Sequence, residues 1–193
     1  MFKEKATSTD LVSSAVQKGK GVTDGLSGGG VFTVKCLDKD GNLKWEAQSP
    51  NLVVNVGLQD MNDKYFSGSA YTAAWYIGLY GAAASNDPAA SDTMSSHAGW
   101  TENTDYTEAT RPACTFGSAT AADPSVISNS ASTADFSMNA TTTIGGAFLT
   151  SDNTKGGTSG ILFSAADFQA PGDRSVVSGD TIKVTYTFNL NAL

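Results

Sequence analysis

The sequence predicts a mainly β protein: an antiparallel β-sandwich of jelly-roll or immunoglobulin-like type, with one short helix and an extended amino-terminal arm. Several short stretches alternate apolar and polar residues, and a period of two is typical of a strand with one buried and one solvated face. Turn-forming residues separate these stretches, as at Asp123-Pro124 and residues 153–157. About seven or eight short strands with regular turns indicate a sandwich.

The first elements along the chain are a hairpin and a helix. Residues 31–37 and 43–47 read as two strands, because Asp40-Gly41 between them is a strong hairpin signal. A helix is predicted over residues 55–65, where one side would carry the apolar side chains Val53, Val56, Leu58, Met61, Tyr65 and Phe66.

The remaining strands follow the same reasoning. The nearly continuous apolar run at residues 75–80 predicts a central strand that is buried on both faces. Residues 81–105 read as a long loop. Further strands are predicted at residues 107–116, 135–139, 143–150 and 160–168.

The carboxyl-terminal stretch alternates most clearly. Its apolar face would consist of Ile182, Val184, Tyr186, Phe188 and Leu190. Its polar face would present Lys183, Thr185 and Thr187, which we take as candidate partner-binding residues. The hypothesis is that this strand lies on an edge of the sandwich and pairs with a neighbouring subunit.

Residues 1–30 are predicted to form a flexible arm, and residues 31–193 the sandwich domain. Gly28-Gly29-Gly30 would be the flexible joint. Leu11, Val12, Ala15 and Val16 form a helical pattern that is too short to fold alone. The arm's candidate partner-binding residues are Lys3, Lys5, Lys18 and Lys20, which either dock on an acidic surface or stay solvated, as termini usually do.

Composition narrows the class of function. The formal net charge is −7 and charged residues make up 16% of the chain, which argues against direct nucleic-acid binding by the folded body. No apolar run reaches transmembrane length, and the start has no signal-peptide pattern, so we expect no membrane partner and synthesis in a cytoplasm. A surface with few charged side chains lowers the cost of burial in an assembly.

The sequence offers no convincing reaction centre, metal site or cofactor site, so we expect a protein that is not an enzyme. The single histidine, His97, has serine neighbours but no nucleophile-elbow pattern. The two cysteines, Cys36 and Cys114, read as small core residues, although a disulfide between them stays open. Arg111 and Glu102 are predicted to form an ion pair, because an arginine beside aromatic residues needs a carboxylate.

A carbohydrate-binding or glycan-hydrolysing module is the alternative from another class. It would need two facing carboxylates, and Glu46, Glu102, Asp105 and Glu108 are those nearest to aromatic residues. The aromatic side chains Trp75, Trp100 and Tyr106 could stack on a sugar, but we expect them in the core or at an interface, and Trp100 is a candidate partner-binding residue.

Five stretches together resemble small virion structural proteins of tailed bacteriophages. They are residues 50–57, 75–79 and 97–102, Arg111, and residues 178–186. The resemblance extends over residues 31–193. It lies in the general character and the order of these stretches, and it does not depend on a catalytic motif. It implies a β-sandwich that oligomerises on the virion without enzymatic activity.

The expected function is therefore that of a capsid cement (decoration) protein on the virion surface. Its partners would be the major capsid protein and copies of itself, with residues 1–30 gripping the shell or a neighbour. The alternative is a tail or head-fibre component that binds a host receptor or adaptor through the loop at residues 81–105.

Overall fold

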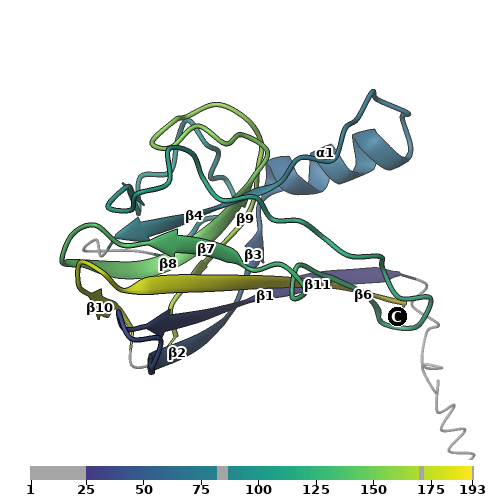
Figure 1. The fold of residues 1–193 in the computed structure, drawn as a ribbon. Helices are drawn as coiled ribbons and strands as arrows, with labels where there is room; N and C mark the ends of the chain where they lie inside the picture. The colour runs from purple at the N-terminus through teal and green to yellow at the C-terminus, as the bar shows by residue number, and fades with distance from the viewer. Residues whose placement is uncertain (1–24, 82–86, 170–171, 193) are drawn as a thin grey trace, which may run out of the picture.

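The computed structural model describes residues 25–81, 87–169 and 172–192. Within these residues, two antiparallel sheets pack face to face with one helix beside them, which confirms the predicted mainly β sandwich (Figure 1). The finer assignment to a jelly-roll or immunoglobulin-like type stays a prediction. The elements are β1 (Leu26–Leu37), β2 (Leu43–Pro50), β3 (Leu52–Val53), α1 (Asn55–Tyr65), β4 (Tyr76–Gly81), β5 (Glu102–Asn103), β6 (Ser125–Ser128), β7 (Ala134–Ser137), β8 (Thr142–Thr150), β9 (Leu162–Asp167), β10 (Arg174–Val176) and β11 (Thr181–Ala192).

The two sheets are named here by their central strands. The β11 sheet has the strand order β2-β1-β11-β6, and β7 also pairs with β11. The β8 sheet has the order β3-β9-β8-β4-β5, and β10 also pairs with β8. The predicted hairpin is confirmed, since β1 and β2 pair antiparallel around the turn at residues 38–42.

The main core lies between the sheets. Alternation along β1 and β11 turns Phe32, Tyr186 and Val184 toward the β8 sheet, where all three are fully buried. The register Phe32↔Tyr186 places these two rings side by side, with centroids 4.7 Å apart. The predicted apolar face of the last strand is thus confirmed. Cys36 and Cys114 are free and buried in this core, as small core residues.

A second apolar cluster covers the outer face of the β8 sheet. Tyr80 and Phe148 on this face meet Met94 and Trp100 from the loop after β4, and all four are nearly inaccessible to solvent. The strand at residues 76–81 is therefore buried on both faces, as its continuous apolar run predicts.

The helix is confirmed at the predicted residues, but it contacts the sandwich mainly through its first turn. Gly57 is its only buried residue, and a Cβ there would lie 2.4 Å from the Phe163 carbonyl oxygen of β9. The glycine therefore permits close docking of helix on strand. Beyond this contact α1 projects away from the sheets, as Figure 1 shows.

The predicted flexible joint is wrong. β1 begins at Leu26, and Gly28 to Gly30 pair with β11. A Cβ on Gly30 would lie 2.8 Å from the Tyr186 hydroxyl, and one on Gly28 would lie 3.2 Å from the Phe188 ring. These two glycines make room for aromatic rings in the neighbouring strand, which is a packing role. Residues 1–24 lie outside the described part of the chain.

Two strand predictions also fail. β11 is central, because β1 pairs with it on one side and β6 and β7 on the other. Residues 107–116 form no strand; the chain makes isolated bridges at Tyr106 to Met138 and at Ala113 to Tyr76. Pro112 has no N–H to donate, and the buried Arg111 beside it turns toward Glu102, so a regular ladder cannot form there.

Candidate interaction site

An open apolar groove lies between α1 and the end of the sandwich and has a volume of about 580 Å³. Its floor comes from both sheets and includes Phe163, Tyr186 and Phe188. One wall comes from α1 and the segment after it, with Met61 and Tyr71. Figure 1 shows α1 and the far ends of β1 and β11 extending to the same side of the molecule. The lining residues place the groove on this side, between α1 and the strands β6, β9 and β11.

The floor of the groove is held by ring packing and hydrogen bonds. The Phe163 ring packs edge-on against both Trp75 and Phe188, with centroids 5.5 Å apart in each case. Tyr186 Oη accepts hydrogen bonds from Asn51 Nδ2 at 2.8 Å and from Ser164 Oγ at 3.3 Å. Burial raises the pKa of the Tyr186 phenol, so it stays neutral and acts as a structural anchor.

The wall of the groove is held by polar contacts at its rim. Trp75 Nε1 donates to Tyr71 Oη at 2.7 Å, so the segment after the helix folds back over the groove. The Lys64 ammonium lies 5.6 Å from the centre of the Tyr71 ring and 3.8 Å from Asp60. The rim thus carries one carboxylate and one ammonium around an otherwise apolar surface.

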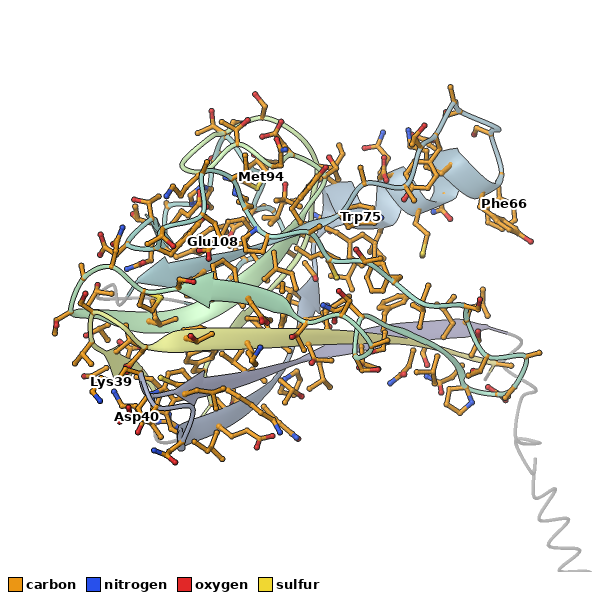
Figure 2. All side chains as sticks on the ribbon, in the orientation of Figure 1. Lys39, Asp40, Phe66, Trp75, Met94 and Glu108 are labelled. Atoms are coloured by element: carbon orange, nitrogen blue, oxygen red, sulfur yellow. The ribbon has the colours of Figure 1, made fainter. Side chains whose placement is uncertain are left out.

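Two aromatic rings mark the end of the helix, and we call Tyr65 and Phe66 the aromatic tip. Tyr65 is 82% exposed and Phe66 is 75% exposed. Their rings pack edge-to-face at 4.9 Å. Figure 2 shows Phe66 at the end of α1 far from the sheets and Trp75 where the helix meets them. Contiguous exposed apolar groups of this kind are typical of interaction sites.

Trp100, the aromatic candidate for partner binding, is buried within its own chain, and its role toward a partner stays a prediction. Its side chain is only 2% exposed, and its Nε1 donates to Asp92 Oδ2 at 3.1 Å. The indole stacks on His97, with ring centroids 3.8 Å apart. Trp100 therefore belongs to the loop that covers the β8 sheet, and the histidine is packed against it (Figure 2 places Met94 in the same loop).

The polar face of β11 is half-buried and engaged within its own sheet. Lys183 forms an ion pair with Asp135 of β7, and Thr187 Oγ1 hydrogen bonds to Ser128 of β6. Thr185 lies opposite Thr33 of β1. The edge-pairing hypothesis is wrong, because both sides of β11 already carry strands. Whether this face binds a partner stays a prediction, and Lys3, Lys5, Lys18 and Lys20 lie outside the described residues.

The predicted pair of Arg111 and Glu102 is confirmed as a buried clamp. Arg111 Nε and Nη2 donate to the two Glu102 carboxylate oxygens at 2.9 and 2.7 Å. The guanidinium also donates to the Asp152 and Gly157 carbonyl oxygens, which holds the loop after β8. Because Glu102 is fully engaged, its role is structural. The other three carboxylates that the glycan-hydrolase alternative named are Glu46, Asp105 and Glu108; Glu46 pairs with Lys35, Asp105 accepts from Asn103, and Glu108 accepts from the Ser137 amide.

The buried thiols are chemically quiet. Burial raises the pKa of Cys36 and of Cys114 to about 12, which keeps both as thiols at neutral pH. Within the described ranges, no group of three or more His, Cys, Asp or Glu side chains is placed to hold a metal ion. In the same part of the chain, no helix combines the length and the hydropathy needed to cross a bilayer.

Searches against protein-family models, curated proteins and solved structures found no match to this chain. The groove was missed by sequence reasoning, because its residues come from segments far apart in the chain. One signal was available for the tip. The doublet Tyr65-Phe66 ends the predicted helix just before Ser67-Gly68, where a turn leaves no neighbour to bury it.

Proposed function

We propose that this protein is a structural subunit of a tailed-bacteriophage virion: a capsid cement protein that binds the shell of major capsid protein and also associates with copies of itself. The single observation that carries this proposal is the aromatic tip, held out from the body by α1. Aromatic side chains dominate the binding energy of protein interfaces. The resemblance in texture to phage virion proteins supplies the class of partner.

The structure of the body supports an assembly role. The helix docks closely on β9 at Gly57 and projects from the sandwich, so it carries the tip away from the body. A rigid, exposed aromatic anchor loses little conformational entropy on binding. The fibre alternative would present the loop at residues 81–105 to a host receptor, but in its described part, residues 87–101, Met94 and Trp100 pack onto the β8 sheet. The cement function is therefore preferred.

Binding to purified phage heads tests the proposal. The variants Tyr65→Ser and Phe66→Ser remove the tip, and each should weaken head binding at least tenfold, as expected for an interface hot spot. Each should change the free energy of unfolding by less than about 0.5 kcal/mol, because both side chains are exposed. Leu43→Ser is the matched control, since Leu43 is a 56% exposed apolar residue at the distant hairpin.

Two results would overturn the proposal. If the wild-type protein is present in a dozen copies or fewer per virion, on the order of a tail or fibre component, the cement function fails. If the protein decorates heads but the tip variants bind like wild type, the class of protein survives and the assigned surface fails.

A further inference from the structure

The groove beside the tip is built for an apolar occupant of its own. Its floor and wall are mainly aromatic, and no described residue fills it. Trp75 is half-buried there and Tyr71 is 50% exposed. Covering such a surface removes apolar area from water, which contributes about 25 cal/mol per Å². The rim carries Asp60 and Lys64, which lie 3.8 Å apart and offset each other's charge, so the apolar lining is what selects the occupant.

We propose that the groove binds the amino-terminal segment, residues 1–24, of a second copy of this chain. The inference deepens the self-association part of the proposed function and rests on it for its setting in the virion. It needs no capsid, so it is testable on the purified protein.

The first argument is the place where this segment joins the body. β1 begins at Leu26, which pairs with Ala192 at the end of β11. Gly30, four positions further, pairs with Phe188 of the groove floor. At the rise of a strand these positions are about 13 Å apart. The 24 residues before Gly25 therefore join the body close to the groove of their own subunit. The groove they would fill is the equivalent one on a second copy.

The second argument is the sequence of the segment. Leu11, Val12, Ala15 and Val16 repeat at the spacing of one helical face. A single apolar face of this length gains stability only when it lies in a groove, because an isolated short helix is marginal in water. The four lysines at positions 3, 5, 18 and 20 flank that apolar stretch and are a third of the 12 basic residues in a chain of net charge −7. The positive charges of these lysines are opposite in sign to the net charge of the chain.

The third argument concerns the direction of the chain and favours a neighbour over the same subunit. β1 stays extended and paired through Leu26, whose side chain is 74% exposed. The first residue of β1 therefore lies at the far end of the strand, beyond the position of Gly30 at the groove (Figure 1). A path into its own groove would need a reversal there, whereas a path into a neighbour's groove does not. Exchange of segments would link each copy to another.

Two matched sets of variants disable each half of the contact. Gly117 lines the groove and has room for a Cβ, whose nearest neighbour would be the Ser128 carbonyl oxygen at 3.7 Å, so Gly117→Leu is the variant chosen to obstruct the groove. Gly81→Leu is its control, because Gly81 has the same room (Thr143 carbonyl oxygen at 3.6 Å) and lies outside the groove. Leu11→Asp disables the segment, and Ser13→Asp, off the apolar face, is its control.

Analytical ultracentrifugation of the full-length variants then gives the answer. Wild type and both controls should self-associate, and Gly117→Leu and Leu11→Asp should each weaken association at least tenfold. An equal mixture of those two variants should recover a 1:1 complex, because one carries an intact segment and the other an intact groove. Unchanged thermal unfolding of each variant separates loss of contact from loss of fold.

Three results would overturn the inference. They are a monomeric wild type, association that survives both substitutions, and a mixture that fails to form the 1:1 complex. A monomeric wild type whose head binding still depends on the aromatic tip would leave the proposed cement function intact. A protein that self-associates through the groove but has no affinity for heads would leave this inference intact and overturn the cement function. The two failures are therefore distinguishable.

Discussion

Two aromatic surfaces of the sandwich differ in how far the chain itself covers them. On the outer face of the β8 sheet, Tyr80 and Phe148 are covered by Met94 and Trp100 of the same chain, and the Arg111–Glu102 clamp holds the adjoining loops. At the groove, by contrast, Trp75 is only half-buried and Tyr71 is 50% exposed. A long loop covers one aromatic surface, and a buried ion pair holds the loops beside it. The other surface stays open within the described residues, and our proposal assigns it to a second copy of the chain.

The largest loss of stability is expected from a substitution in the covered region. Arg111→Ala leaves the Glu102 carboxylate buried without its cation and frees the loop after β8, so we expect a loss of about 3–5 kcal/mol in the free energy of unfolding. Urea denaturation measures it. Lys35→Ala is the control, since the exposed pair with Glu46 at 3.5 Å contributes about 1 kcal/mol or less. Equal losses in the two variants would mean that the clamp does not close this region.

A smaller loss of stability is expected from a substitution at the wall of the groove. Gly57→Ala places a methyl group against the Phe163 backbone and pushes α1 off β9, at a cost of about 1–3 kcal/mol. Because α1 forms one wall of the groove, self-association should weaken as well. Gly29→Ala, where a Cβ meets nothing within 4 Å, should leave both stability and association unchanged. A Gly57→Ala protein that associates like wild type would show that the position of the wall is unimportant.

The smallest expected effect is a pH dependence beside the covered region. Burial raises the pKa of Asp167, and the charges of Asp87 and Asp173 add to this shift. A raised pKa means that the folded state favours the protonated acid, so stability falls as pH rises from about 4 through the folded value. Asp167→Asn should therefore be slightly more stable than wild type at pH 7, with the gain vanishing near pH 4. Urea denaturation at both pH values checks this, and a less stable variant at pH 7 would contradict it.

Local patterns predicted the elements whose signals are contained within a few residues. The Asp40-Gly41 hairpin, the helix at Asn55–Tyr65 and the strand at Tyr76–Gly81 all form where expected. The pairing of strands is not local. Nothing within residues 180–190 indicates that β1 lies on one side of β11 and that β6 and β7 lie on the other.

Side-chain roles were misjudged where distant segments decide them. Trp100 was expected either in the core or at an interface, and only the positions of Phe148 and Tyr80 beneath it decide that it is buried. Gly28 and Gly30 resemble a linker until Phe188 and Tyr186 are placed beside them. The pair of Arg111 and Glu102 was predictable, because a large cation among aromatic residues requires a carboxylate wherever the chain leads.

Fluorescence quenching of Trp75 tests the central claim most directly, namely that the open aromatic surface becomes covered in the assembled protein. The difference in acrylamide quenching between wild type and Trp75→Phe isolates the groove tryptophan from Trp45 and the buried Trp100. We predict that the Trp75 component becomes protected as concentration drives assembly, while the remaining emission is quenched equally throughout. A Trp75 component that is quenched to the same extent in dilute and assembled protein would contradict the account.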